Sequence, residues 1–224
     1  MAIYQLPESN IFPHPSLSEE DGLLAVGGDL SPERILTAYS MGIFPWFGPE
    51  DPILWWSPDP RCVLFPSEFK PSKSLRLLLQ KNIFEIRFDT DFSGVIKNCA
   101  SVVRSDEAGT WISPEIIEAY SSLHKMGFAH SVETYLDGKL VGGLYGVSVG
   151  NVFCGESMFF SISNASKVAF CFLVEKLKEL KYKLLDNQMT TPHLLSLGAK
   201  EISRDHYLEI LEKSKTKNLD PIKW

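Results

Sequence analysis

Periodic and alternating apolar positions divide the chain into a loop-rich first part and a longer part of mixed helices and strands. Before residue 62 one helix is clear, because Ser31 is a natural N-cap, Pro32 fits the first helical position and Gly42 marks the end. The remainder of this part is dense in proline, glycine and aromatic residues. Such a composition predicts irregular structure around the single helix.

From residue 63 onward the pattern predicts alternating strands and helices. Strands are expected at 63–65, 84–88, 128–136, 139–149, 151–160 and 183–186, and helices at 73–81, 113–127, 164–180 and 204–213. Asp137-Gly138 and Gly150-Asn151 are strong turn dipeptides, so the three central strands form an antiparallel meander.

This order of elements predicts an α/β (α+β) fold with a sheet of mixed direction and helices on its faces. The GNAT-like N-acyltransferase fold is one such arrangement. With 224 residues, of which 44% are apolar, the chain can bury one large core and a small accessory unit. We expect a small N-terminal domain at 1–62 and a GNAT-like domain at 63–224.

Several features point to a cytoplasmic protein that does not span a membrane; a monomer is assumed, since no sequence feature bears on oligomeric state. No apolar run approaches the roughly 18 residues that a membrane helix needs, and residues 1–7 do not form a secretory signal. The four cysteines are widely spaced, which favours reduced thiols over disulfides or a zinc site.

The net charge of -6 argues against a protein that coats nucleic acid through bulk electrostatics. A local basic segment lies between residues 70 and 87, where Lys73, Arg76 and Lys81 can share a helical surface and are candidate phosphate contacts. An ordinary solvated helix explains these residues equally well.

Asp186 and Gln188 are the first candidates for chemistry. They end an apolar strand, and alternation along a strand places both side chains on one face, where they could act together. Polar residues at such a position often line a cleft, although an aspartate that caps the next helix is just as ordinary.

Glu156 is a second candidate, in a strand that carries Gly155. A glycine within a strand often marks a bulge, and a bulge would let Phe153, Glu156 and Met158 converge. The alternative is a plain core strand with Glu156 at its solvent edge.

Trp46 and Trp111 lie in predicted loops, where tryptophan makes a good stacking platform for a base. Burial in the core is the alternative for both. The histidines show no metal-ligand spacing, and the chain has no P-loop, GxGxxG motif or nucleophile motif. No metal or cofactor is expected.

Eight segments in unbroken order resemble the bacterial leucyl/phenylalanyl-tRNA-protein transferases. They are 21–30 (DGLLAVGGDL), 42–47 (GIFPWF), 55–61 (WWSPDPR), 109–112 (GTWI), 153–159 (FCGESMF), 164–167 (NASK), 186–188 (DNQ) and 196–199 (SLGA). Together they cover nearly the whole length of the chain, so they are far more specific than any single motif.

The resemblance implies transfer of leucine or phenylalanine, with methionine as a further candidate, from tRNA to proteins with an N-terminal Arg or Lys, in the N-end rule degradation pathway. It implies that Trp46 and Trp111 hold the terminal adenosine of leucyl-tRNA or phenylalanyl-tRNA. The side-chain pocket would be lined by Leu144, Phe153, Met158, Phe170, Leu173 and Leu185. The reacting centre would be surrounded by Glu156, Asp186 and Gln188. Family members often carry Met at position 144 and Phe at position 173.

An aminoacyl ester is already activated, so its reaction with an amine needs neither ATP nor a metal. A side-chain amide is a poor base, which favours a positioning role for Gln188, with Asp186 fixing its orientation. The ribose 2'-hydroxyl is a candidate proton carrier. The sequence singles out no carboxylate for the acceptor's cationic side chain.

Two other functions compete with this one. An acetyl-CoA-dependent N-acetyltransferase would need a glycine-rich loop before its helix, whereas residues 160–167 contain no glycine. A non-catalytic RNA-binding module fits poorly with the acidic composition and with Asp186 beside an apolar pocket.

Overall fold

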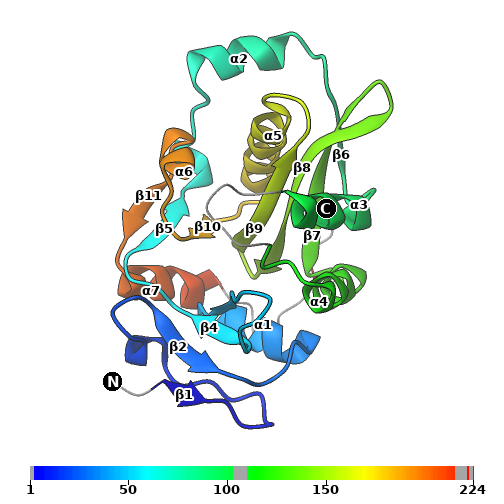
Figure 1. Cartoon of the computed structure of the whole chain (residues 1–224). Coiled ribbons are helices and arrows are strands. Elements are labelled where there is room, and N and C mark those ends of the chain that lie inside the picture. The colour runs from blue at the N-terminus through cyan, green and yellow to red at the C-terminus, as the bar shows by residue number, and fades with distance from the viewer. Residues whose placement is uncertain (1–2, 103–109, 215–220, 222–223) are drawn as a thin grey trace.

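The computed structural model describes residues 3–102, 110–214, 221 and 224. Gly109, which precedes Trp111 in one of the sequence motifs, lies outside the described residues. The elements fall into two sheets with helices packed against them (Figure 1).

The first sheet has four strands in the order β1-β2-β4-β3 and lies at one end of the molecule. Its strands are β1 (Tyr4–Gln5), β2 (Leu23–Val26), β3 (Phe44–Pro45) and β4 (Leu54–Trp56). The short helix η1 (Pro15–Leu17) precedes β2, and α1 (Pro32–Ser40) follows it. As predicted, Ser31 caps α1, with its hydroxyl accepting from the Arg34 N–H.

The second sheet has seven strands in the order β11-β5-β10-β9-β8-β7-β6. The strands are β5 (Arg61–Leu64), β6 (Glu85–Phe88), β7 (Ala129–Leu136), β8 (Lys139–Val149), β9 (Val152–Phe160), β10 (Leu184–Gln188) and β11 (Lys200–Ile202). Strands β7, β8 and β9 form the predicted antiparallel meander, and β10 lies parallel to β9. The sheet is therefore of mixed direction, which confirms the predicted fold class.

Helices cover both faces of this sheet. They are η2 (Pro66–Glu68), α2 (Lys73–Gln80), α3 (Phe92–Ser101), α4 (Pro114–Lys125), α5 (Ala165–Glu179), α6 (Pro192–Ser196) and α7 (Arg204–Ser214). Buried residues of α5 form one core with Leu144 and Leu185. Buried residues of α3, α4 and α7 form the other core with Cys154, together with the apolar residues of the first sheet.

The irregular structure expected around the first helix was wrong, because β1 to β4 form a sheet there from strands of two to four residues, too short to show an alternating pattern. In the second part of the chain, three elements were not predicted from the sequence. Helix α3 contains Gly94 and several residues of low helix propensity, so its pattern is weak. Its N-cap is Asp91, whose carboxylate accepts from the Gly94 N–H. The short elements α6 and β11 depend on tertiary contacts, since β11 exists only through pairing with β5. The predicted domain boundary after residue 62 falls inside β5 and stays a prediction.

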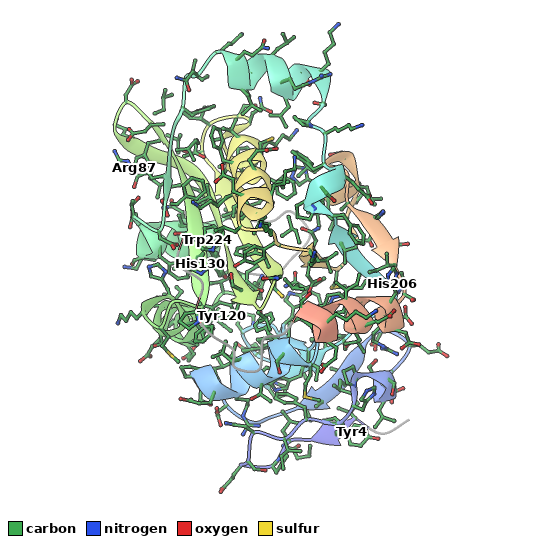
Figure 2. All side chains as sticks on the ribbon, turned by 180° about the vertical axis from the view of Figure 1, so that it is seen from behind. Tyr4, Arg87, Tyr120, His130, His206 and Trp224 are labelled. Atoms are coloured by element: carbon green, nitrogen blue, oxygen red, sulfur yellow. The ribbon has the colours of Figure 1, made fainter. Side chains whose placement is uncertain are left out.

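Helix α7 and the last described residue connect distant parts of the chain. Tyr207 and Leu208 of α7 pack against Gly42, at the end of α1. The ring of Trp224 stacks on His130, with 4.4 Å between ring centroids (Figure 2). All four cysteines are free and buried. Among the described residues, no helix is long and apolar enough to cross a membrane.

Candidate active site

A cavity of about 600 Å³ opens where β9 and β10 stop pairing. The two strands are in register from Leu184 opposite Val152 to Asp186 opposite Cys154. Among the residues predicted for the site, those that line the cavity are Trp46, Trp111, Leu144, Glu156, Met158, Phe170, Leu173, Leu185 and Gln188. Contributions thus come from the first sheet region, the meander, α5 and β10.

The shape of β9 at this point comes from a bulge. Tyr145 lies opposite Ser157 and Gly146 lies opposite Gly155, so Glu156 is an extra residue with no partner on β8. In an unbroken strand, Phe153 and Met158 would lie on opposite faces, because five positions separate them. The extra residue at the bulge shifts the alternation of side chains by one, and both residues consequently belong to the same core. Glu156 and Met158 both line the cavity.

Phe153 does not line the cavity, unlike the other predicted pocket residues. Its ring is fully buried and contacts Tyr182 and Trp224, with centroid distances of 6.5 and 5.1 Å. Phe153 precedes the bulge and lies deeper in the sheet, where β9 and β10 are still paired. It supports the pocket floor through packing.

The side chains of Gln188 and Glu156 meet across the gap between the strands. Gln188 Nε2 donates to Glu156 Oε1 at 3.1 Å. Two tyrosine hydroxyls also donate to this carboxylate, Tyr39 to Oε1 at 2.7 Å and Tyr120 to Oε2 at 3.2 Å. Because the amide nitrogen of Gln188 is directed at Glu156, its carbonyl oxygen is oriented away from that carboxylate.

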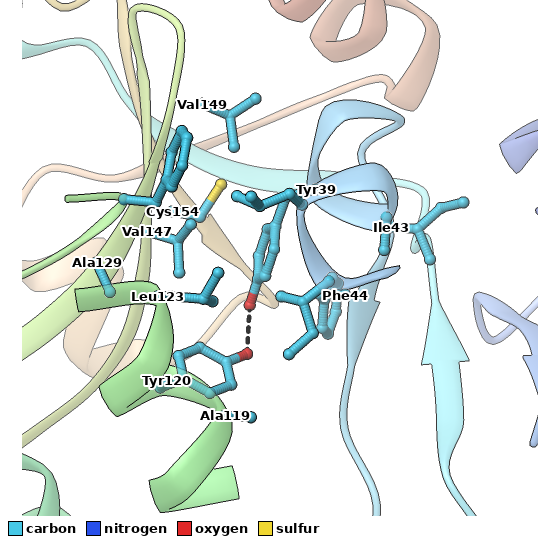
Figure 3. Packing of buried hydrophobic residues seen from close by; sticks show 14 of the residues in the cluster. Tyr39, Ile43, Phe44, Ala119, Tyr120, Leu123, Ala129, Val147, Val149 and Cys154 are labelled. Carbon is cyan, nitrogen blue, oxygen red and sulfur yellow. Dashed lines mark hydrogen bonds between the residues drawn. The ribbon is translucent and has the colours of Figure 1, made fainter. Parts of the chain in front are cut away.

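Tyr39 and Tyr120 come from helices on the same side of the sheet. Their hydroxyls lie 2.6 Å apart, and both side chains are fully buried (Figure 3). Sequence analysis did not identify either residue. In the sequence, Tyr39 fits the apolar pattern of α1 and is therefore read as a core residue. The one available signal is that a buried tyrosine hydroxyl usually requires a hydrogen-bond partner.

Burial raises the pKa of Glu156 to about 7. The hydrogen bonds from Tyr39, Tyr120 and Gln188 lower it, while the negative charge of Asp186 raises it further. A carboxyl group with this pKa can exchange a proton near neutral pH, which is a common property of acid–base groups in active sites.

Asp186 is fully buried and does not line the cavity. Its carboxylate accepts two hydrogen bonds from Arg61, at 2.9 and 2.7 Å, and one from the hydroxyl of Tyr207 at 2.9 Å. Arg61 is also fully buried, and although burial lowers its pKa, the charge and hydrogen bonds of Asp186 together with Tyr207 and Cys154 raise that pKa above its ordinary value. Asp186 and Arg61 thus form a buried ion pair with a structural role.

The link between Asp186 and Gln188 passes through the backbone. Asp186 Oδ1 accepts from the Gln188 N–H at 2.9 Å, and no bond joins the two side chains. Gln188 has a left-handed φ of 58° and follows a register shift between β10 and β5. Asp186 therefore holds the unusual backbone turn that presents Gln188 to the cavity.

Trp46 and Trp111 border the cavity on the side of the first sheet. Trp46 packs edge-on against Trp56 at 5.6 Å, and its carbonyl accepts from Trp56 Nε1 at 2.6 Å. Trp111 is 8% exposed. Both indoles are held by packing and present part of their surface to the cavity.

The basic residues of α2 lie near a second, smaller cavity. Lys73, Arg76 and Lys81 are all exposed. This cavity, of about 310 Å³, is lined by Lys81 and also by Lys70 and Lys167, whereas Lys73 and Arg76 do not line it. Positive charge thus gathers where α2 approaches the beginning of α5.

Comparison with known proteins identifies the family. The model of the leucyl/phenylalanyl-tRNA protein transferase family matches residues 63–212, and the model of its N-terminal domain matches residues 28–59. The chain belongs to the leucyl/phenylalanyl-tRNA protein transferase family. This confirms the resemblance seen in the sequence motifs.

Relatives in this family match over nearly their full length. The leucyl/phenylalanyl-tRNA–protein transferase of Sulfurimonas denitrificans is 57% identical, over 90% of this chain and 88% of that protein. Those of Nitrosospira multiformis and Thermodesulfovibrio yellowstonii are 57% and 51% identical, covering 93% and 100% of this chain and 90% and 91% of their own lengths. Among solved structures, a GCN5-related N-acetyltransferase from Kribbella flavida aligns with 75% of this chain and 59% of its own at 10% identity, with a TM-score of 0.40.

Proposed function

We propose that this protein moves leucine or phenylalanine from the 3' end of aminoacyl-tRNA to the N-terminal Arg or Lys of acceptor proteins. The observation that carries the proposal is one continuous cavity with three chemically different parts. Two indoles border one part, apolar side chains line the second, and Glu156 with Gln188 lies in the third. An adenosine, an apolar aminoacyl group and an attacking amine match these parts in turn.

The apolar part explains why leucine and phenylalanine would both be accepted. Leu144, Phe170 and Leu173 line it and offer no polar side-chain atom. An apolar pocket discriminates between apolar side chains by only about 1–3 kcal/mol per methylene, whereas charged side chains would lose their hydration there. Dual specificity is therefore the expected behaviour.

The reaction is the aminolysis of an ester. The α-amine of the acceptor attacks the aminoacyl carbonyl carbon, a C–N bond forms, and the bond from that carbon to the ribose oxygen breaks. One proton leaves the amine, and one proton ends on the ribose hydroxyl. The enzyme must hold the amine against the carbonyl and provide a place for the proton.

Gln188 and Glu156 divide these two tasks in our proposal. The Gln188 carbonyl accepts a hydrogen bond from the amine and orients its lone pair, because its amide nitrogen is committed to Glu156. Glu156, with a pKa of about 7, attracts the acceptor's α-ammonium group and takes one proton from it. The second proton that this nitrogen loses passes to the ribose oxygen as the ester bond breaks. Asp186 acts through the Gln188 backbone and touches neither reactant.

A direct assay tests the function. The protein is incubated with a peptide beginning with Arg and with either labelled leucyl-tRNA or labelled acetyl-CoA. We expect label on the peptide only from leucyl-tRNA. Transfer from acetyl-CoA in the absence of tRNA would instead establish an N-acetyltransferase.

Two substitutions at position 188 test its role. Gln188→Ala is expected to lower kcat by about 10- to 100-fold with little change in the KM for leucyl-tRNA, because positioning is lost while donor binding remains. Gln5→Ala, an exposed glutamine of β1, is the control. Wild-type rates in Gln188→Ala would remove this residue from the mechanism, and an active Gln188→Glu with a shifted pH profile would make position 188 the proton acceptor.

A further inference from the structure

A carboxylate that no step of the proposed reaction uses lies beside the cavity, behind Thr190. Thr190 lines the cavity next to Met189, two residues beyond Gln188. The hydroxyl of Thr190 donates to Glu201 Oε1 at 2.6 Å. The carboxylate of Glu201 therefore lies within one hydrogen bond of a lining residue.

Glu201 also has a fixed position relative to Gln188. On adjacent strands, Gln188 of β10 lies opposite Cys62 of β5, and Cys62 lies opposite Glu201 of β11. Neighbouring strands are about 4.8 Å apart, so the backbones of Gln188 and Glu201 are roughly 10 Å apart in one row across the sheet. The distance between the side-chain ends of Gln188 and Glu201, which a bound acceptor residue must span, can be shorter than this backbone distance.

The charge of Glu201 is free to act on a ligand. Glu201 is exposed, and no ion pair to it occurs among the described residues. The adjacent Lys200 does not neutralise it, because Lys200 Nζ pairs with Glu68 at 2.8 Å and lies over the ring of Phe65. The only hydrogen bond to the Glu201 side chain in the described structure comes from Thr190.

The cavity beside Thr190 suits a long side chain with an aliphatic stem. Met189 lines the cavity and is 42% exposed, which provides an apolar surface beside the polar Thr190. Lysine and arginine combine an apolar stem with a charged end, and a stem packs on an apolar surface while its charge reaches a polar one. Lysines 70, 81 and 167, in contrast, line the second cavity, to which Glu201, Met189 and Thr190 do not contribute.

We propose that Glu201, presented by Thr190, binds the cationic side chain of the acceptor's N-terminal residue and so determines the specificity for Arg or Lys. This inference rests on the proposed function. With the α-amine at the Gln188 carbonyl, the acceptor side chain extends over Met189 and Thr190, and its guanidinium or ammonium group reaches the Glu201 carboxylate.

Two peptides that differ only in charge test the proposal. One begins with Arg and the other with citrulline, its uncharged isostere, and leucine transfer to each is measured at saturating leucyl-tRNA. The wild-type protein is expected to prefer the Arg peptide by about tenfold or more in kcat/KM. Glu201→Gln is expected to lower kcat/KM for the Arg peptide by about tenfold, mainly through KM, and to leave the citrulline peptide unchanged.

Further variants separate charge recognition from a structural effect. Glu201→Asp should retain part of the preference, and Glu201→Lys should abolish it. Glu209→Gln is the matched control, since it removes another exposed carboxylate, which pairs with Lys213 on α7 and does not line the cavity. An unchanged preference in Glu201→Gln, or an equal fall for both peptides, would overturn the assignment of Glu201. Failure of the wild-type protein to move leucine to either peptide would overturn the proposed function itself.

Discussion

Glu156 shows at the scale of a single residue how its surroundings set the chemistry of a carboxyl group. Burial in the gap between β9 and β10 disfavours its charged form, and three hydrogen bonds restore part of the stability of that form. The resulting pKa of about 7 makes both protonation states accessible at neutral pH. The same pKa has consequences for activity and for stability.

For activity, the charged form of Glu156 is the proton acceptor in the proposed mechanism. The rate of transfer by the wild-type protein should rise with pH through about 7. Glu156→Gln should lower kcat by about 100-fold and leave only the inflection of the acceptor's α-amine, near pH 7.7–8.0. A pH–rate profile from pH 5.5 to 9 measures both. An inflection near 7 that persists in Glu156→Gln would assign it to another group.

For stability, the raised pKa means that the folded protein binds a proton which the unfolded chain releases. The wild-type protein should therefore lose stability as the pH rises from the ordinary glutamate value of 4.5 through about 7. Glu156→Gln lacks this titration, so its stability relative to wild type should increase over that interval and level off above it. Urea denaturation at pH 4.5, 6 and 8 measures the difference, and a constant difference would contradict the raised pKa.

Tyr39 tunes the same carboxyl group from α1. Its hydroxyl donates to Glu156 and lowers the pKa of that group. Tyr39→Phe should consequently move the inflection of the pH–rate profile to higher pH and leave the KM for leucyl-tRNA unchanged. Tyr182→Phe is the control, because the hydroxyl of Tyr182 pairs with Ser148. An unshifted inflection in Tyr39→Phe would show that this bond does not affect the reacting group.

At the scale of elements, the cavity depends on how closely α5 approaches β8. Gly142 of β8 allows this approach, since a Cβ atom there would lie 2.5 Å from the Cβ of Ala165 and 3.0 Å from its carbonyl carbon. Gly155 of β9 has more room, with its nearest neighbour, Leu185 Cδ1, at 3.6 Å. The close packing of α5 on the sheet therefore requires a glycine at position 142, whereas position 155 has room for a methyl group.

Gly142→Ala should force α5 away from the sheet and destabilise the protein by about 1–3 kcal/mol. The displacement should also alter the apolar part of the cavity, to which α5 contributes Phe170 and Leu173. Gly155→Ala should change stability much less. Urea denaturation measures the free energy of unfolding of both variants. Equal losses of stability would show that the close contact between β8 and α5 does not make Gly142 more sensitive than Gly155.

At the scale of the whole molecule, the pair of Arg61 and Asp186 connects parts that are far apart in sequence. Arg61 begins β5 and donates to the carbonyl of Gly42, at the end of α1. Asp186 lies on β10, and Tyr207 brings α7 to the same carboxylate. The pair holds the N-terminal part, the large sheet and the last helix together beneath the active site.

Asp186→Asn should therefore act mainly on stability. It leaves the buried Arg61 without its compensating charge, which is expected to cost about 3–5 kcal/mol in the free energy of unfolding. Glu85→Gln, which breaks an exposed pair with Arg87, should have no measurable effect. Urea denaturation compares the two. Wild-type stability in Asp186→Asn, combined with a loss of activity, would point instead to a direct role of this carboxylate in the reaction.

The sequence by itself determined the local features of this protein. Ser31 caps α1 as predicted, Ser113 caps α4 in the same way, and the meander turns at the predicted turn dipeptides. These signals involve residues that are neighbours along the chain, so their effect can be predicted without a fold. The family motifs likewise identified the family and pointed to Glu156 and Gln188, both of which line the cavity.

Only the tertiary structure decided which distant groups meet. Tyr39 reaches Glu156 across 117 positions, and Arg61 reaches Asp186 across 125. The bulge at Glu156 and the left-handed backbone of Gln188 likewise depend on pairing with neighbouring strands. Such contacts result from the packing of whole elements, whose final positions no local pattern specifies. For this reason the sequence predicted an orienting role for Asp186 beside Gln188, whereas its buried ion pair with Arg61 and its bond to the Gln188 backbone could be found only in the structure.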